Sequence, residues 1–178
     1  ARLTRDYAGR GMNLVRVAGR WRFQTAPDLE HYLTDVKEAP RKLSRAALET
    51  LAIIAYHQPV TRAEVEDVRG VAVSKGTLDV LMELSWIRMR GRRRTPGRPV
   101  TYGTTDGFLA HFNLETIRDL PGRDDLKAAG LLDPRLPKDF EMPEPMMVDD
   151  LSYDEDPIDE RNDPEFFEDF LNDDEGDA

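Results

Sequence analysis

The chain has 178 residues, contains no cysteine and carries a formal net charge of −10 at pH 7. The lack of cysteine excludes disulfide scaffolds, thiolate metal sites and cysteine nucleophiles, and no apolar run is long enough for a membrane-spanning helix. The first residues carry no signal-peptide pattern, so we expect a protein of the reducing cytoplasm.

The net charge is divided unevenly along the chain. Residues 1–115 carry 19 Lys and Arg against 13 Asp and Glu, a net charge of +6, whereas residues 116–178 carry 6 against 22, a net charge of −16. The last forty residues hold 18 acidic side chains and one basic side chain, a composition typical of disordered segments. This division predicts a basic folded part and an acidic disordered tail.

The N-terminal residues predict a helix end, a β-hairpin and a second short helix. Residues 14–18 and 21–25 alternate apolar and polar side chains around a turn at Gly19, which is the pattern of a half-buried hairpin. The second helix is expected to begin at Pro27 and to run to about Val36. Because these pieces cannot bury a core by themselves, we expect them to be the end of a larger domain.

Three helices are predicted next. The strongest covers residues 43–56, whose apolar side chains recur at helical spacing almost all round the axis. A second helix is expected over residues 62–69, with Thr61 and Glu64 forming a capping box at its start. A third is expected over residues 75–85. The breadth of apolar positions on the first of these helices, residues 43–56, predicts that it is the central helix of the core.

A second hairpin and a further helix, over residues 105–112, follow the three helices. The hairpin strands are predicted around residues 86–90 and 100–104, with Ile87 and Met89 packing inward and the arginines facing water. Three helices followed by a hairpin is the winged-helix arrangement, a helix-turn-helix variant, and the first hairpin resembles the end of another copy.

We therefore predict an α+β, mainly helical protein with tandem winged-helix domains, of which the first is truncated. The predicted divisions are residues 1–38 for the C-terminal remnant of the first domain, 41–115 for the second domain, 116–138 for a short helical extension and 139–178 for the acidic disordered tail.

No catalytic or metal site is predicted. The histidines His31, His57 and His111 lie on different predicted elements and lack the spacing of metal ligands. Residues 70–77 superficially resemble a phosphate loop, but they lack the Gly-Lys-Ser/Thr order and follow a helix instead of a strand. We therefore expect no enzyme activity, no cofactor and no small-molecule substrate.

Six arginines crowd the second hairpin, and each could neutralise a nucleic-acid phosphate. The alternative is a solvated hairpin with a structural turn, and the sequence leaves both open. The candidate phosphate contacts are Arg88, Arg90, Arg92, Arg93, Arg94 and Arg98. The third helix offers Lys75 against Asp79 and Glu83, a poor set for contacting base edges. Sequence-specific recognition is therefore disfavoured, and protein–protein contact gains support.

The acidic tail contains one apolar patch, on one face of a helix that would begin near Asp163. This patch could bind a groove on a partner or fold back on the basic hairpin, and chance aromatic residues in a disordered tail are the other interpretation. The patch consists of Phe166, Phe167, Phe170 and Leu171.

Several long motifs resemble, in order, the segregation and condensation protein B family (ScpB). They lie at residues 10–23, 41–56, 58–66, 69–71, 96–99 and 102–109. The resemblance implies two winged-helix domains, homodimerisation largely through the first, and a non-enzymatic accessory role in the bacterial SMC complex, which condenses and segregates chromosomes during cell division. It also implies binding to the kleisin subunit (ScpA) and, through it, to the SMC ATPase.

The resemblance favours a cytoplasmic, nucleoid-associated adaptor with no membrane partner and at most non-specific DNA contact. Two other hypotheses remain open. A winged-helix transcriptional regulator would bind duplex DNA in a sequence-dependent manner. In the other hypothesis, the acidic tail competes with phosphates for the six hairpin arginines and so inhibits DNA binding.

Overall fold

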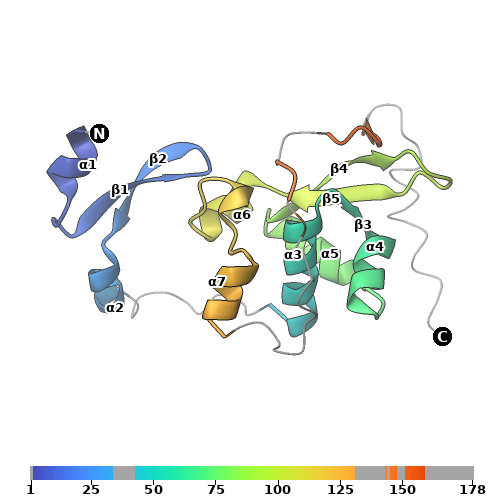
Figure 1. Cartoon of the computed structure of the whole chain (residues 1–178), viewed down its shortest axis with the longest axis horizontal. Coiled ribbons are helices and arrows are strands. Elements are labelled where there is room, and N and C mark those ends of the chain that lie inside the picture. Colours follow the sequence, from blue (N-terminus) through green and yellow to red (C-terminus); the bar gives the residue numbers. More distant parts are fainter. Residues whose placement is uncertain (1, 34–42, 131–142, 144, 148–150, 159–178) are drawn as a thin grey trace.

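The computed structural model of the chain describes residues 2–33, 43–130, 143, 145–147 and 151–158. A small N-terminal unit precedes a larger body of helices and antiparallel strands (Figure 1). The fold is therefore of mixed α and β type.

The N-terminal unit is built on one antiparallel hairpin, in which Val17 pairs with Arg20 beside the turn. The turn residues Ala18 and Gly19 have φ values of 48° and 69°, in the left-handed region that tight hairpin turns use. The predicted hairpin is therefore present, with strand boundaries that differ by at most two residues. The elements are α1 (Arg2–Tyr7), β1 (Met12–Val17), β2 (Arg20–Thr25), η1 (Pro27–Leu29) and α2 (Glu30–Leu33).

The first two helices of the body begin with side-chain caps, of which the one at Thr61 was predicted. The Ser44 hydroxyl accepts a hydrogen bond from the Ala47 amide at 3.1 Å, at the start of α3. Thr61 and Glu64 form the capping box of α4, since each side chain accepts from the other's backbone amide. The helices are α3 (Arg45–His57), α4 (Arg62–Arg69), α5 (Lys75–Glu83), α6 (Asp106–His111), η3 (Ile117–Asp119) and α7 (Arg123–Ala128).

The core lies where α3, α4 and α5 meet the sheet. Ile54, Val65 and Leu81, one from each of these helices, are 0% exposed and belong to one apolar cluster with Ile87 and Ile117. Leu48 on α3 stays 51% exposed, so the apolar belt predicted around this helix is only partly covered by the described residues.

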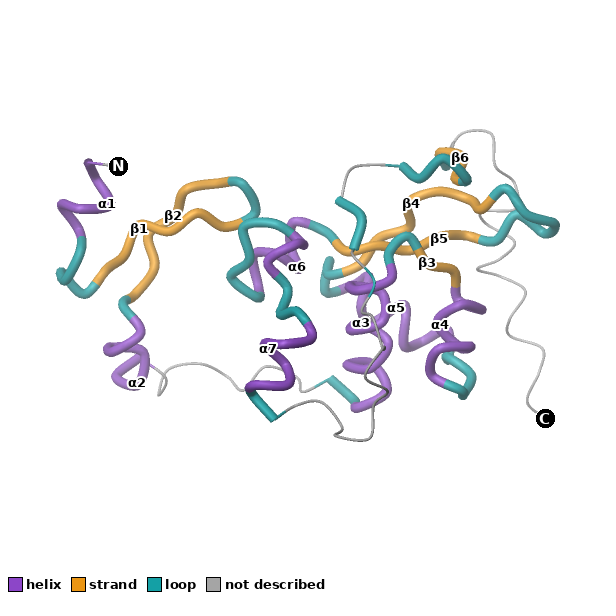
Figure 2. The backbone as a smooth tube through the Cα atoms, viewed as in Figure 1, coloured by secondary structure: helices purple, strands orange, loops and turns teal. Residues whose placement is uncertain are grey.

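A four-stranded antiparallel sheet packs beside these helices, in the order β3-β5-β4-β6 (Figure 2). Its register shifts between Met89 and Gly91, which marks a bulge in β4. The last strand, β6, comes from the acidic tail and pairs with the outer edge of β4. The strands are β3 (Val60–Thr61), β4 (Ile87–Arg93), β5 (Val100–Thr104) and β6 (Glu155–Pro157).

The N-terminal unit contacts the body through the turn of its hairpin. The Ala18 amide donates to the Leu114 carbonyl at 2.9 Å, and the Arg16 guanidinium lies 3.0 Å from the Glu115 carboxylate. Figure 2 shows this turn beside the loop that follows α6. The described part of the unit therefore docks by its turn and leaves Trp21 and Phe23 on β2 60% and 50% exposed.

Two sequence predictions are wrong in the described residues. Arg90 and Arg92 were expected to face water but are 7% and 2% exposed, because the bulge between Met89 and Gly91 turns the strand and β6 covers it. The tail was expected to be disordered throughout residues 139–178, but residues 155–157 form β6. Ion pairs with arginines of the hairpin hold this strand in place, and the composition of the tail alone does not reveal them.

Candidate functional site: the arginine hairpin and the acidic segment

Two parts of the chain that are distant in sequence meet at one edge of the sheet. The arginine hairpin comprises residues 87–104, and the acidic segment comprises residues 151–158. In the pairing of β4 with β6, Arg92 lies opposite Asp156 and Arg93 lies opposite Glu155. The ladder continues beyond β6, because the Arg94 amide donates to the Asp154 carbonyl at 2.8 Å. The acidic segment is thus an added strand on the hairpin.

Aspartates on either side of Glu155 pair with arginines near the hairpin tip. Asp154 accepts from Arg93 Nη1 at 2.8 Å, and Asp156 accepts from Arg94 Nε at 2.7 Å. The second oxygen of Asp156 accepts from Arg98 Nη2 at 3.3 Å. The side chains of Arg94 and Arg98 are 57% and 58% exposed, so their pairs with Asp156 are screened by water and individually weak.

Glu155 itself points into the protein. Its carboxylate lies 3.8 Å from the guanidinium of Arg90, and the two side chains are 0% and 2% exposed. The same carboxylate oxygen, Oε2, also accepts a hydrogen bond from the Ser152 amide at 2.8 Å. A charge buried to this degree needs its partner, because an isolated one would lose its hydration without compensation.

Arg93 links the acidic segment to the helical body. Its Nη2 donates to Glu64 Oε2 at 2.8 Å, while its Nη1 holds Asp154. Burial alone would lower the pKa of the Arg93 guanidinium, but the two carboxylates outweigh that effect and raise it. Burial likewise would raise the pKa of Glu64, whereas its bonds from Thr61 and Arg93 lower it. Both groups are therefore held in their charged forms.

Hydrogen bonds also hold Asp154 and Asp156 in their charged form. The pKa of Asp154 is lowered, first by a hydrogen bond from Ser152 and then by Arg93, against the effect of burial. The pKa of Asp156 is lowered, first by the hydrogen bond from Arg94 and then by charge, which includes that of Arg98. The two aspartates are therefore anionic at neutral pH.

Gln58, at the end of α3, also holds residues of the C-terminal part of the chain to the helical body. The side chain of Gln58 is buried, and its Nε2 donates to the Met146 carbonyl at 2.7 Å. Its Oε1 accepts from the Thr104 amide at 2.6 Å and from the Thr104 hydroxyl at 2.9 Å. Arg90 Nη1 also donates to the Met147 carbonyl at 3.2 Å. Gln58 therefore ties α3, β5 and residues 146–147 together.

The close approach of β6 requires a glycine at position 91. A Cβ atom on Gly91 would lie 2.5 Å from the Asp156 carbonyl oxygen, nearer than real Cβ contacts come. The obstructing atom belongs to the backbone, so rotation of a side chain cannot relieve the clash. Gly91 thus allows the acidic segment to pack against β4.

The six predicted phosphate contacts fall into different environments. Arg94 and Arg98 are exposed and pair with the acidic segment, and Arg93 is partly buried between two carboxylates. Arg90 is buried under the segment, and Arg92 is buried with its Nη1 donating to the Arg98 carbonyl at 3.0 Å. Arg88 is exposed on β4. The hairpin therefore brings the arginines together, but not as one open surface.

Other sequence candidates lie elsewhere. The tail patch of Phe166, Phe167, Phe170 and Leu171 is outside the described residues. Within the described ranges, no group of three His, Asp or Glu side chains is placed to hold a metal ion. In that same part of the chain, no helix combines the length and apolar character needed to cross a bilayer.

The residues that complete this site carry no local signal in the sequence. Asp154, Glu155 and Asp156 belong to the predicted acidic tail, and Gln58 belongs to the motif at residues 58–66. The available signal was opposite charge alone: three consecutive acids, Asp154-Glu155-Asp156, in a chain whose hairpin carries six arginines.

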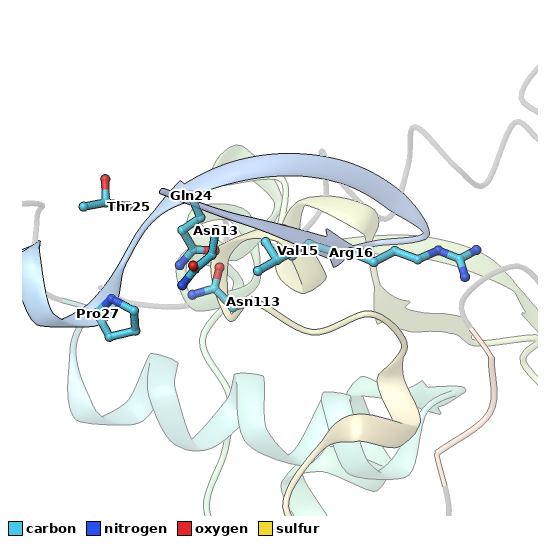
Figure 3. A pocket seen from close by; sticks show the side chains of 8 residues that line it. Asn13, Val15, Arg16, Gln24, Thr25, Pro27 and Asn113 are labelled. Carbon is cyan, nitrogen blue, oxygen red and sulfur yellow. The ribbon is translucent and has the colours of Figure 1, made fainter. Parts of the chain in front are cut away.

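A separate cavity of about 370 Å³ lies between the first hairpin and the loop after α6. Its polar lining includes Asn13, Gln24 and Asn113, which gather on one side in Figure 3. Arg22 Nη2 donates to Asn113 Oδ1 at its edge. The lining also includes Arg16, whose guanidinium pairs with Glu115, and the described lining residues form no metal-binding cluster.

A family model described as segregation and condensation complex subunit ScpB matches residues 1–123. The chain belongs to this family. The match includes the first hairpin, α3 to α6 and the arginine hairpin, and it ends before the acidic segment.

Individual ScpB relatives agree with this assignment. The segregation and condensation protein B homolog of Coxiella burnetii is 45% identical over 125 residues, which are 70% of this chain and 60% of that protein. Segregation and condensation protein B of Desulforamulus reducens is 43% identical over 131 residues, 72% of each chain. The chain thus spans about 60% of the length of the first of these relatives.

The crystal structure of ScpB from Mycobacterium tuberculosis is 37% identical in sequence and covers 64% of this chain and 72% of that one. Its TM-score of 0.38 is too low to support a shared overall arrangement. The family assignment therefore rests on sequence.

Proposed function

We propose that this ScpB-family chain is a non-enzymatic accessory subunit of the bacterial SMC complex. In that role it binds the kleisin subunit (ScpA) and, through the kleisin, the SMC ATPase, in the cytoplasm at the nucleoid. Its task is to support chromosome condensation and segregation during cell division. The observation that carries the proposal is the match of residues 1–123 to the ScpB family.

The order of elements in the body supports a winged-helix domain as the basis of this role. α3, β3, α4 and α5 precede the β4–β5 hairpin, and β3 pairs with β5. This is the order of a helix-turn-helix unit with a wing. The first hairpin, followed by α2, would be the wing end of a preceding unit of the same kind.

Exposed apolar side chains on the helices support a protein partner. Leu48 on α3 and Val68 on α4 are 51% and 52% exposed. Each is next in sequence to one member of the Glu49–Arg69 ion pair, whose side chains lie 3.2 Å apart and link the two helices. Large exposed apolar side chains are more typical of a protein interface than of a DNA surface.

The N-terminal hairpin supports homodimerisation through the first domain. Its exposed side chains include Trp21 and Phe23, and Leu3 on α1 is 58% exposed. Large apolar groups at one place on a small unit favour association with another apolar surface.

Binding of purified full-length chain to purified kleisin, measured by isothermal titration calorimetry, tests the proposal. We expect a defined stoichiometry and a dissociation constant in the micromolar range or tighter. The double variant Leu48→Ser with Val68→Ser should bind at least about tenfold more weakly, because two apolar contacts of about 1 kcal/mol each are lost. Arg118→Ser, at an exposed residue of η3, is the control. Failure of the unmodified chain to bind at micromolar concentration would contradict the proposal.

A sequence-specific regulator has less support from α5. Its exposed or partly exposed polar side chains include Lys75, Asp79 and Glu83, so acidic groups outnumber the basic one. A helix that contacts base edges usually presents Arg, Asn or Gln. Equal affinity for duplexes of different sequence is therefore expected, and a strong preference for one sequence would favour the regulator.

A further inference from the structure

The acidic segment covers a row of guanidinium groups on the arginine hairpin. Carboxylates of Asp154, Glu155 and Asp156 pair with four arginines of one edge, which are Arg90, Arg93, Arg94 and Arg98. We propose that this edge binds the phosphates of duplex DNA and that the docked acidic segment masks it. The inference is independent of kleisin binding.

The segment presents its charges as a nucleic-acid backbone would. Asp154 lies in the turn before β6 and Asp156 lies on β6, and each offers its carboxylate to an arginine of the hairpin. Guanidinium groups that bind two neighbouring carboxylates can also bind the phosphates of a backbone. Arg94 and Arg98, which bind the two oxygens of Asp156, could hold a phosphate by the same geometry.

The position of the hairpin suits a duplex. Figure 1 shows the tip of the β4–β5 hairpin extending beyond the helices. Residues 94–98 at this tip are all exposed. An extended hairpin with several arginines is a favourable contact for a duplex backbone, whose affinity depends on the number of phosphates neutralised.

The docked segment is held weakly enough to be displaced. β6 has three residues, and the pairs made by Asp156 are exposed to solvent. Asp154 Oδ1 and Glu155 Oε1 are buried without a hydrogen-bond partner among the described residues, and such atoms reduce the net gain from docking. A polyanion at sufficient concentration can therefore compete with the segment for the arginines.

Duplex binding by full-length variants tests the inference. Binding of a labelled mixed-sequence duplex is measured by fluorescence anisotropy for the unmodified chain and for Asp154→Asn with Asp156→Asn. The control, Asp67→Asn with Asp124→Asn, removes two exposed carboxylates from α4 and α7 and makes the same change in net charge. We expect the first variant to bind at least about tenfold more tightly at 50 mM salt. The slope of log K against log salt concentration should become steeper by about 2, one unit for each additional phosphate contact.

The control should stay within about twofold of the unmodified chain, because its carboxylates lie outside the hairpin. Equal gains in both double variants would mean that net charge alone is responsible, and no gain in either would mean that the segment masks nothing. Both results overturn the inference. Tighter binding of single-stranded RNA than of the duplex would also overturn it.

Gly91→Ala provides a test that leaves every charge in place. Its Cβ would collide with the Asp156 carbonyl and push the segment off β4. Hydrogen exchange of the Arg94 amide reports docking, because this amide donates to Asp154 in the docked state. We expect faster exchange and tighter duplex binding together. Loss of Arg94 protection without a gain in duplex affinity, in any variant, overturns the inference.

The unmodified chain provides a final check. When it is saturated with duplex, the Arg94 amide should exchange faster than in the free protein because the segment has left β4. Bound duplex with unchanged Arg94 protection would show that DNA binds elsewhere, and would also overturn the inference.

Discussion

The carboxylate of Glu155 lies 3.8 Å from the guanidinium of Arg90, in a position where both side chains are almost completely buried. The pair joins the acidic segment to the middle of β4, beneath the more exposed pairs of Asp154 and Asp156. In the docked state each of the two charges depends on the other for compensation. If the segment leaves, water can hydrate both.

Replacement of Glu155 by alanine should therefore undock the segment and leave the helical body folded. We expect the Arg94 amide to exchange at least about tenfold faster, while the free energy of unfolding of the body changes by less than about 1 kcal/mol. Native-state hydrogen exchange and urea denaturation measure the two effects. Glu83→Ala, at an exposed residue of α5, is the control. If the free energy of unfolding of the body fell by about 3–5 kcal/mol, Arg90 would have stayed buried without its partner.

Docking should depend on pH only in acid. The hydrogen bond from Arg94 is the main cause of the lowered pKa of Asp156, so the docked state favours the charged carboxylate. Its contribution to docking is thus complete above the ordinary pKa of 3.8 and is lost as the pH falls through the lowered value. An NMR titration of the Asp156 carboxyl group should give a midpoint below 3.8, and Arg94→Gln should shift it upward. A midpoint at or above the ordinary value would contradict the pairing.

The substitution Gln58→Leu should destabilise the body through its buried polar groups. It removes the acceptor of the Thr104 amide and hydroxyl and the donor to Met146. A buried amide left without an acceptor costs about 1–3 kcal/mol, so we expect the free energy of unfolding, measured by urea denaturation, to fall by that amount. His57→Gln, at the exposed neighbouring position, should change the stability by less than about 0.5 kcal/mol. Equal losses from both variants would contradict the role of Gln58.

Two aliphatic residues on α3 should differ in their effect on stability. Ile54 is 0% exposed in the core, so Ile54→Ala is expected to cost about 2–5 kcal/mol through lost burial and the cavity it leaves. Leu48 is 51% exposed on the same helix, and Leu48→Ala should cost less than about 1 kcal/mol. Urea denaturation compares them, and a similar cost at both positions would mean that Leu48 is covered.

The elements that sequence analysis predicted well depend on short-range chemistry. The capping box of Thr61 and Glu64 could be predicted because both residues and the backbone groups they satisfy lie within one helical turn. The same holds for the two hairpins, whose alternation and turn residues are local. The arginines were correctly placed on the second hairpin, but the burial of Arg90 and Arg92 was not predicted. That burial depends on a strand more than sixty residues away in the sequence.

By itself, the sequence determined the helices of the body, both hairpins, the concentration of arginines and the ScpB family, because each of these is expressed in local patterns or in long matched motifs. Only the tertiary structure decided the place of the acidic segment. Its composition predicts an unfolded chain when it is considered alone, since like charges repel and few apolar groups can be buried. Next to the arginines of β4 the same carboxylates find opposite charges and an open strand edge, and the segment becomes β6.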